Sequence, residues 1–317
     1  MANKIPKSAE ISVVIPVYNE ELVIKHSVRR INDVLKSLEV QYEIIVVNDG
    51  STDSTLKVLI EIKRAIENLR IINLPRNLGH MEAITAGYEA SVGAYIVTLD
   101  ADCQDPPEVI VDMYRVITNS IKVDVVQAIR VDRNVDSWFK RNSARVYYWI
   151  IKKLTGIAVI NNAADFRLVT REVLNLLLKL PEKNKIYRLL IPYLGFRIET
   201  VPIIRAKRLA GKSKYSLAKM FRLSIDSIFN FSDAPLKLIT RIGFFFSILF
   251  LILTLYFLIT WILGIKTLVP GWLSIVTLIL LSSSLILTSI GVVGEYIGKI
   301  YIQNLNRPST KRNEIIE

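Results

Sequence analysis

The stretch that decides the fold is Glu43-Ile44-Ile45-Val46-Val47-Asn48-Asp49-Gly50-Ser51-Thr52-Asp53. It begins as a short, continuous apolar run, which is typical of a strand buried on both faces of a parallel sheet. It ends in a polar cluster rich in turn-forming residues, and a helical pattern follows from Asp53 to Ile66. A strand, a polar turn and a helix in this order form the repeating unit of an α/β fold.

The same unit recurs along the first half of the chain. Buried strands are expected at Ile11–Pro16, Glu43–Asn48, Arg70–Leu74, Tyr95–Leu99 and Asp124–Ala128, with further strands at Phe166–Thr170 and Phe196–Ile203. Helices are expected at Glu20–Leu38, Asp53–Ile66, Gly79–Ser91, Pro107–Thr118 and Trp138–Leu154. This alternation predicts a doubly wound, mostly parallel sheet with helices on both faces.

Polar clusters follow the strands at three places: Val17-Tyr18-Asn19-Glu20, Asp49-Gly50-Ser51-Thr52-Asp53 and Asp100-Ala101-Asp102. In an open parallel sheet, ligands bind beyond the carboxyl ends of the strands. We therefore expect the chemistry where these clusters meet.

The acidic cluster is the strongest of the three signals. Asp100 and Asp102 follow an apolar strand with one residue between them, so their carboxylates can face one site. Mg²⁺ or Mn²⁺ prefers such oxygen ligands and can bridge to a phosphate, where it would neutralise a diphosphate leaving group. The neighbouring Asp105 and Glu108 are explained more simply as acidic residues at the start of a helix.

The other clusters have two interpretations each. The Asp49 carboxylate can accept hydrogen bonds from a base or a ribose, while Ser51 or Thr52 can cap the helix that follows. Gly79 opens a helix near Arg76, an arrangement that can help to bind phosphate, and the adjacent His80 is expected to pack or hydrogen-bond rather than to catalyse. No glycine motif of a dinucleotide site or P-loop is present.

Two long runs without charge mark the C-terminal part of the chain. Ile242–Ile265 and Thr267–Gly294 are separated only by Lys266, and each is long enough to cross a bilayer as a helix. We expect a hairpin that turns at Gly264–Trp272. The alternative, a buried helical hairpin in a soluble core, fits uncharged runs of this length poorly.

Charge and cysteine content predict the orientation of the hairpin. The net charge is +12, and basic residues flank the two runs at Lys237, Arg241, Lys299 and Arg307. The positive-inside rule then places both termini in the cytoplasm, and the polar start of the chain has no signal peptide. The single cysteine, Cys103, allows no internal disulfide, as expected in a reducing compartment.

A basic segment precedes the first run. Leu217–Phe231 carries apolar residues at helical spacing, which favours a helix in the membrane interface over an ordinary core-packed helix. Seven basic and no acidic residues lie between Thr200 and Ile225. Lys219 and Arg222 suit anionic lipid, whereas Arg208 and Lys214 flank a glycine-containing turn and suit a phosphate. Nucleic acid is an unfavoured partner beside two spans.

The ordered motifs resemble glycosyltransferase family 2. They are Val14-Ile15-Pro16-Val17-Tyr18-Asn19-Glu20, Asn48-Asp49-Gly50-Ser51-Thr52-Asp53 and Asp100-Ala101-Asp102-Cys103-Gln104-Asp105-Pro106-Pro107. Two later motifs, Ala164-Asp165-Phe166-Arg167-Leu168 and Arg208-Leu209-Ala210-Gly211-Lys212-Ser213-Lys214-Tyr215, resemble the branch similar to dolichol-phosphate-mannose synthase. With two C-terminal spans, the chain looks like the bacterial polyprenyl-phosphate type that makes undecaprenyl-phosphate glucose.

The resemblance implies a GT-A catalytic domain at 1–215, interfacial helices at 216–240, a transmembrane hairpin at 241–298 and a cytoplasmic tail at 299–317. It also implies a role for individual residues. The nucleotide sugar would be bound by Pro16, Tyr18, Glu20, Asp49 and Asp100, the metal by Asp102 and Gln104, and the lipid phosphate or diphosphate by Arg130, Arg141, Arg208, Ser213 and Lys214. Asp165 matches the family's catalytic carboxylate.

The implied reaction is an inverting transfer from a nucleotide diphosphate sugar, with UDP-glucose favoured, to a polyprenyl phosphate at the cytoplasmic face of the plasma membrane. A lipid phosphate scarcely needs a general base near pH 7, so we expect Asp165 mainly to orient Arg167 or another basic residue. A processive polysaccharide synthase is the first alternative, but Val131 stands where that class has Trp after Gln127-Ala128-Ile129-Arg130. A non-enzymatic lipid carrier is the second, and a homo-oligomer is compatible with the resemblance.

Overall fold

The computed structural model describes residues 9–102, 104–120, 122–131, 153, 160, 162–182, 185–206, 234–263, 271–305 and 314–316. The chain divides into two compact units, of which the first comprises Met1–Ser216 with Arg307–Glu317 and the second Leu217–Asn306. The four-part division expected from the sequence stays a prediction. The expected interfacial helix Leu217–Phe231 and Cys103 lie outside the described residues, as does the expected helix Trp138–Leu154 apart from Lys153.

Within the described part of the first unit, eight strands form one sheet in the order β7-β5-β6-β4-β1-β2-β3-β8. The strands are β1 (Ile11–Val17), β2 (Tyr42–Asn48), β3 (Leu69–Asn73), β4 (Tyr95–Thr98), β5 (Val125–Arg130), β6 (Ala163–Thr170), β7 (Ile198–Ile203) and β8 (Glu314–Ile316). The seven strands expected from apolar runs are all present, whereas β8 was not expected. Strands β1 and β2 are buried along their whole length, as expected for strands covered on both faces.

The sheet is mostly parallel, and its one reversed internal strand positions the candidate site. Strand β1 pairs in parallel with β2 and β4, whereas β6 runs antiparallel to β4 and β5. In the register of β4 with β6, Thr98 lies opposite Arg167. The two strands run in opposite directions. The first residues of β6, including Asp165, therefore lie beside the carboxyl end of β4 and near the residues that follow it, such as Asp100.

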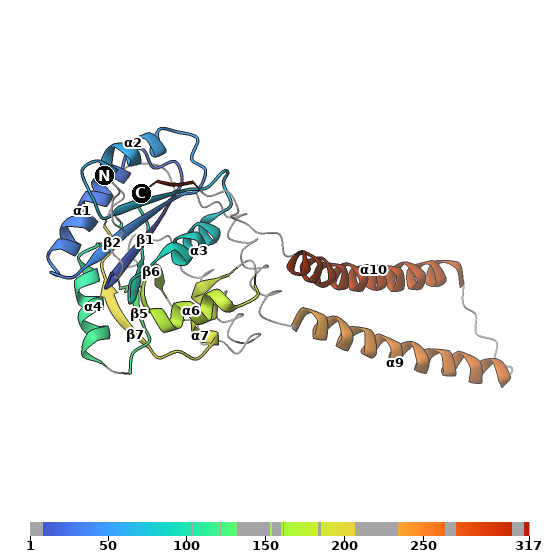
Figure 1. The fold of residues 1–317 in the computed structure, drawn as a ribbon. Coiled ribbons are helices and arrows are strands. Elements are labelled where there is room, and N and C mark those ends of the chain that lie inside the picture. The colour runs from blue at the N-terminus through green and yellow to red at the C-terminus, as the bar shows by residue number, and fades with distance from the viewer. Residues whose placement is uncertain are drawn as a thin grey trace. The chain divides into compact units, whose positions relative to one another are not determined.

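Helices cover both faces of this sheet (Figure 1). One face carries α1 (Ile24–Lys36), α2 (Thr55–Lys63) and α4 (Val109–Asn119), and the other carries α3 (His80–Ala90), α6 (Arg171–Lys179) and α7 (Tyr187–Tyr193). The first four helical patterns along the chain therefore formed helices close to their predicted bounds. The layered arrangement is that of a doubly wound α/β domain.

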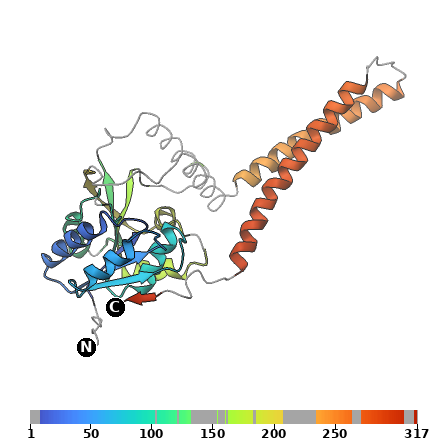
Figure 2. The same cartoon turned by 90° about the horizontal axis from the view of Figure 1, so that it is seen from above.

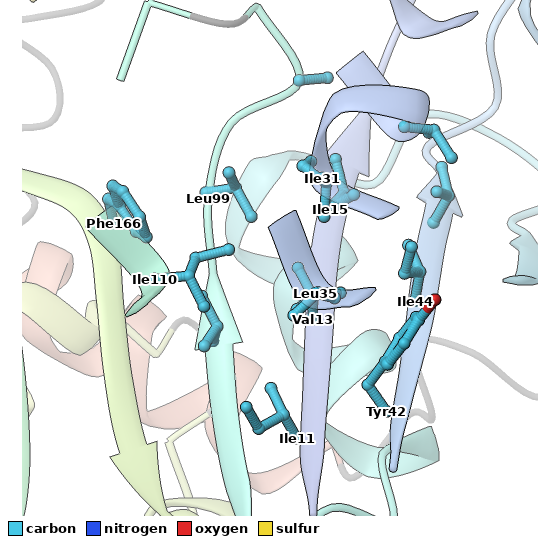
Figure 3. Close-up of a cluster of buried hydrophobic side chains, with 14 of the residues drawn as sticks. Ile11, Val13, Ile15, Ile31, Leu35, Tyr42, Ile44, Leu99, Ile110 and Phe166 are labelled. Atoms are coloured by element: carbon cyan, nitrogen blue, oxygen red, sulfur yellow. The ribbon is translucent and has the colours of Figure 1, made fainter. Parts of the chain in front are cut away.

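A core cluster of buried hydrophobic side chains lies between α1 and the face of the sheet that α1 covers, as Figure 3 shows. Ile31 and Leu35 of α1 meet Ile15 and Val13 of β1, and all four side chains are at most 1% exposed. Helix α1 presents these residues because its apolar positions recur at helical spacing. Burying each such side chain stabilises the fold by about 1.5–3 kcal/mol relative to leaving it exposed.

On the opposite face, a glycine lets α3 approach the sheet closely. A Cβ atom at Gly87 would lie 2.3 Å from Cγ1 of Val14, which is too close for any side chain. The helix therefore packs directly on β1 and β2. This packing fixes the N-terminus of α3, where His80 begins the helix.

The C-terminal strand β8 returns to the sheet of the first unit and occupies its edge (Figure 2). It runs antiparallel to β3, with Glu314 opposite Asn73 and Ile316 opposite Ile71. Without β8, the backbone groups along this side of β3 would be unpaired, and exposed edge strands promote aggregation. Strand β8 is therefore part of the fold of the first unit.

The second unit contains two long helices, α9 (Ala234–Ile262) and α10 (Gly271–Asn304), which run side by side (Figures 1 and 2). Helix α9 has 29 residues, and at 1.5 Å per residue such a helix exceeds the ~30 Å of a bilayer core. In the described residues, one stretch is long and apolar enough by composition to cross a membrane, Leu281–Tyr301 in α10. The first of the two expected spans stays a prediction.

Candidate active site

The loop after β4 carries the acidic motif and is held in place from two sides. Asp102 Oδ1 accepts a hydrogen bond of 3.1 Å from the backbone N–H of Gln104, which closes a local turn. The Gln104 side chain accepts a hydrogen bond from Nη2 of Arg205, and its backbone carbonyl accepts one of 2.8 Å from the N–H of Ala206. The loop that holds Asp102 is thus tied to the segment after β7.

Asp105 anchors the same loop to β5. Its carboxylate is 4% exposed and forms a two-point ion pair with Arg130, with distances of 3.1 Å from Nε to Oδ1 and 2.7 Å from Nη2 to Oδ2. The nearby Glu108 pairs with Arg30 at 2.7 Å. The expectation that Asp105 and Glu108 serve only to start a helix is therefore incomplete, because both carboxylates bind arginines from other elements. The guanidinium of Arg130, expected at a phosphate, is engaged here by Asp105.

Asp165, at the start of β6, lies between two arginines. Its Oδ1 is 2.6 Å from Nη2 of Arg167, and its Oδ2 is 3.3 Å from Nη2 of Arg188. Burial alone would raise the pKa of Asp165, but Arg188 and Arg167 lower it well below its usual range. The expected contact with Arg167 is present, and the carboxylate stays ionised at neutral pH.

Asp100 lies among other acidic groups. Burial raises the pKa of Asp100 to about 6, and the negative charges of Asp165 and Asp102 also raise it. His80 opposes this shift, with its Nε2 3.7 Å from Oδ1 of Asp100. The side chain of Asp100 is still 36% exposed, so a ligand can reach it. This crowding of negative charge would be relieved by a cation.

A divalent metal fits this donor set. Asp100 and Asp102 supply carboxylate oxygens, whereas the amide oxygen of Gln104 is engaged by Arg205 in this structure. Within the described ranges, no group of three or more His, Cys, Asp or Glu side chains could hold a metal by itself. Mg²⁺ typically uses only one or two protein carboxylates together with substrate phosphates. The residues present therefore suit a metal that arrives with a diphosphate.

The loops after β1 and β2 form the other half of the candidate site. Asp49 is 3% exposed, and its Oδ1 and Oδ2 accept hydrogen bonds of 2.7 and 3.0 Å from the backbone N–H groups of Leu78 and Gly79. Burial raises the pKa of Asp49, while these two hydrogen bonds lower it in part. Asp49 therefore holds the loop before α3, and its predicted contact with a nucleotide stays a prediction.

Gly50 permits this arrangement of loops. Its φ angle is +62°, and a Cβ atom at this position would lie 2.3 Å from the backbone carbon of Arg76. Only glycine satisfies both the left-handed conformation and the close approach. The loop after β2 and the loop before α3 are thereby packed backbone to backbone.

The loop after β1 is locked to the loop after β2 through Asn19, which has a φ angle of +52°. The N–H of Asn19 donates to Oγ of Ser51 at 2.9 Å, and its Oδ1 accepts from the N–H of Thr52 at 2.8 Å. The expected capping of a helix by Ser51 or Thr52 is wrong. Instead, Oδ1 of Asp53 accepts from the N–H of Thr55 at 2.9 Å, where α2 begins.

The structure places most of the predicted residues at or beyond the carboxyl ends of the parallel strands. Pro16 lies one residue before the end of β1 and is buried, with Tyr18 and Glu20 half-exposed just beyond the strand. Four predicted phosphate-binding residues, Arg141, Arg208, Ser213 and Lys214, lie outside the described residues. One residue of the site, Arg188 on α7, was missed. The short helix α7 contains a proline and has no periodic pattern that could have pointed to it.

The sequence of the chain is similar to those of known glycosyltransferases. Residues 12–178 match the sequence profile of Glycosyl transferase family 2. The uncharacterized glycosyltransferase YkcC of Bacillus subtilis (strain 168) is 39% identical over 300 residues, covering 94% of this chain and 91% of its own. The SfII prophage-derived bactoprenol glucosyl transferase of Shigella flexneri is 34% identical over 300 residues, covering 94% of this chain and 96% of its own.

A solved structure shows a similar fold. It is that of glucosyl-3-phosphoglycerate synthase from Mycobacterium tuberculosis in complex with Mn²⁺, UDP-glucose and phosphoglyceric acid. The TM-score is 0.53 at 22% sequence identity, and the match covers 70% of this chain and 79% of that chain. The likeness concerns the α/β domain with its mostly parallel sheet.

Proposed function

This chain belongs to glycosyltransferase family 2, and from that premise we propose that it transfers glucose from UDP-glucose to a polyprenyl phosphate at the cytoplasmic face of a membrane. Its activity as a glycosyltransferase follows from the family. The choice of acceptor is supported by relatives named bactoprenol glucosyl transferases. The observation that carries the proposal is that the acidic loop at Asp100 and Asp102, which follows β4, adjoins Asp165 on the paired strand β6, a carboxylate held by two arginines.

The nucleotide is assigned to the loops after β1 and β2. These loops are locked together by the Asn19 contacts, and Asp49 and Gly50 fix the loop before α3 behind them. A rigid frame of this kind reduces the ordering cost of binding. Pro16, Tyr18 and Glu20 would line the same place, with Asp100 between the nucleotide and the metal.

Asp102 and Gln104 would hold Mg²⁺ or Mn²⁺ beside the diphosphate. When bound, the metal supplies Lewis-acid stabilisation of the negative charge that develops on the departing nucleotide. The chain's own part is to keep the loop in place, through the Asp105–Arg130 ion pair and the backbone contact of Gln104 with Ala206. The amide oxygen of Gln104 would exchange its hydrogen bond from Arg205 for the metal.

The proposed reaction needs no general base. An oxygen of the lipid phosphate forms a bond to C1 of glucose while the bond from C1 to the diphosphate oxygen breaks, with inversion at C1. A phosphomonoester is largely dianionic at pH 7. It becomes a monoanionic diester, and the released UDP takes up the corresponding negative charge, so no proton has to move. Asp165, with its lowered pKa, serves to position arginines rather than to accept a proton.

The position of the C-terminal strand supports a membrane hairpin. Strand β8 lies in the same sheet as β1, although α9 and α10 separate it from the other strands in the sequence. One sheet cannot lie on both sides of a membrane. The chain must therefore cross a membrane an even number of times between β7 and β8. With Leu281–Tyr301 as one span, this favours α9 as the other. The catalytic unit and both termini would then face the cytoplasm, in agreement with the basic flanking residues.

The proposal is tested with the purified full chain in lipid nanodiscs containing undecaprenyl phosphate. A panel of UDP-glucose, UDP-galactose, UDP-N-acetylglucosamine and GDP-mannose is offered with Mg²⁺ or Mn²⁺. We expect glucose transfer from UDP-glucose that stops when EDTA is added. Preference for GDP-mannose would replace the sugar assignment, and activity that is insensitive to EDTA would contradict the role of the metal.

A matched pair of variants tests the acidic loop. Asp102→Ala removes a proposed metal ligand, and we expect transfer to fall by at least about 100-fold, since even residues behind a metal ligand cost 10–100-fold when lost. Asp112→Ala is the control, because Asp112 is an exposed aspartate on α4 that pairs only weakly with Arg115, at 3.6 Å. Equal activity of the two variants would contradict the assignment.

A further inference from the structure

Arg188 is held at the candidate site by its buried neighbour, Tyr187. Tyr187 is 1% exposed, its hydroxyl lies 2.8 Å from Oγ1 of Thr85, and its ring packs edge-on against Tyr88 with the ring centroids 5.1 Å apart. These contacts fix the first residue of α7 against α3. The backbone of the next residue, Arg188, is thereby fixed in position, and its side chain reaches Asp165.

Asp165 is bound by two arginines. Its carboxylate faces two guanidinium groups, with Arg167 at 2.6 Å and Arg188 at 3.3 Å. Asp100 lies near the same carboxylate and adds a second negative charge. What suits one of these arginines to an anionic ligand is therefore its exposure and its hydrogen-bonding geometry, not an excess of positive charge.

The two arginines differ in what they can reach. Arg167 is 2% exposed, and its Nε and Nη1 have no hydrogen-bond partner in the described structure, so it is enclosed behind the carboxylate. The side chain of Arg188 is 31% exposed, and its distance to Asp165 is the longer of the two. Arg188 is therefore the member that can contact a ligand while Asp165 keeps it oriented.

The order of the strands indicates which anion Arg188 would meet. The loops assigned to the nucleotide follow β1 and β2, on one side of β4. Asp165 lies near the start of β6, on the other side of β4, and the loop with Asp100 and Asp102 lies between the two places. A donor whose nucleotide occupied the first side would place its sugar toward β4, and the acceptor would then approach from the side of β6.

We propose that Arg188 binds the phosphate of the acceptor, with Asp165 as its positioning residue. The inference rests on the proposed function, because it assumes an acceptor that carries a phosphate. The planar guanidinium can donate two parallel hydrogen bonds to a phosphate, which orients the attacking oxygen as well as attracting the charge. It also offsets the repulsion between the two anionic substrates.

The inference is tested by steady-state kinetics in which the concentrations of donor and acceptor are varied separately. For Arg188→Gln, we expect the KM for the lipid phosphate to rise roughly 10- to 100-fold, the effect of losing a hydrogen bond to a charged group. The KM for UDP-glucose should stay within about twofold. Arg188→Lys keeps the charge but loses the paired hydrogen bonds, so its acceptor KM should lie between those of the wild type and Arg188→Gln.

Binding without turnover gives a second readout. Farnesyl phosphate, titrated calorimetrically into the full chain without donor, should bind Arg188→Gln at least about tenfold more weakly than the wild type. Arg115→Gln is the control, because Arg115 is an exposed arginine on α4. Thermal unfolding of each variant shows whether the fold is intact.

The outcomes separate this inference from the proposed function. If the wild type transfers sugar but folded Arg188→Gln keeps its acceptor KM and its farnesyl phosphate affinity, the inference is wrong and the function stands. A rise in the donor KM alone would place Arg188 on the diphosphate and also overturn it. If the wild type transfers no sugar to any lipid phosphate, the proposed function itself fails.

Discussion

Asp105 and Arg130 are joined at two points, with Nη2 of Arg130 2.7 Å from Oδ2 of Asp105 and Nε 3.1 Å from Oδ1. The pair connects the end of β5 to the loop that carries Asp102, so the orientation of a proposed metal ligand depends on a contact between two elements far apart in the sequence. Arg130 is 25% exposed, whereas Asp105 is almost fully buried. Removing the arginine leaves a buried carboxylate without its counter-charge.

We therefore expect Arg130→Gln to destabilise the first unit by about 3 kcal/mol, the lower end of the range for breaking a buried pair. Thermal unfolding of the full chain measures this as a fall in Tm of roughly 6 °C or more. The affinity for Mn²⁺ should weaken as well, because the loop loses its anchor. An unchanged Tm together with unchanged Mn²⁺ binding would show that the pair does not hold the loop.

The pH dependence of Asp165 provides a second prediction. Its folded-state pKa is lowered, so its ion pairs contribute stability above the unfolded value, near 3.9, and this contribution is lost only as the pH falls through the lower folded value. Between pH 6 and 9 the carboxylate does not titrate. We expect Asp165→Asn to reduce kcat/KM roughly 10- to 100-fold by releasing charge-assisted contacts, by the same factor at each pH.

Rate profiles of the wild type and Asp165→Asn from pH 6 to 9 check this. Two curves of the same shape agree with a positioning role. A variant that recovers steeply as the pH rises would show that Asp165 acts as a general base, because hydroxide or a more ionised acceptor would then replace it.

Two glycines with left-handed backbones form a matched test of the loop architecture. Gly50→Ala adds a Cβ only 2.3 Å from the backbone of Arg76, whereas Gly195→Ala, at φ +75°, meets nothing within 4 Å. Both substitutions destabilise the fold by about 1–2 kcal/mol, because alanine is strained in the left-handed conformation. Gly50→Ala should lose clearly more stability than Gly195→Ala and should also raise the KM for UDP-glucose. Equal losses in thermal unfolding would contradict the close approach of the two loops.

The C-terminal strand can be tested in the same paired way. Ile316 packs against the hydrophobic core, whereas its neighbour Ile315 is 49% exposed. We expect Ile316→Ser to cost about 1–2 kcal/mol through lost apolar burial and Ile315→Ser to stay within about 0.5 kcal/mol. Thermal unfolding of the two variants measures the difference. If neither substitution changes Tm, β8 does not stabilise the sheet.

The sheet was predictable because its strands are continuous apolar runs. The stretches around Val13 and Val46 alternate with amphipathic helices, so the sequence alone indicates a doubly wound domain. Strand β8 has three residues, Glu314–Ile316, which is too short to show periodicity. Its place in the sheet depends on an antiparallel pairing with β3 that lies more than two hundred residues earlier in the chain.

The candidate site was predictable where its residues follow strands. Asp100, Asp102 and Asp49 were found for this reason, and Asp165 was found by resemblance to the family. The partners of these carboxylates were not predictable. Asp49 binds the N–H groups of Leu78 and Gly79, and Asp165 binds Arg188 across two elements. Such contacts depend on the folded backbone rather than on spacing in the sequence.

The most direct test of the central claim compares undecaprenyl phosphate with undecaprenol as acceptor, using the wild-type chain, UDP-glucose and Mn²⁺. Mass spectrometry of the extracted lipids identifies any product. We predict glucosyl phosphoryl undecaprenol from the phosphate and no glucosylated lipid from the alcohol, because the attacking group is an anionic phosphate oxygen bound beside arginines. Glucose transfer to undecaprenol at a similar rate would contradict the claim.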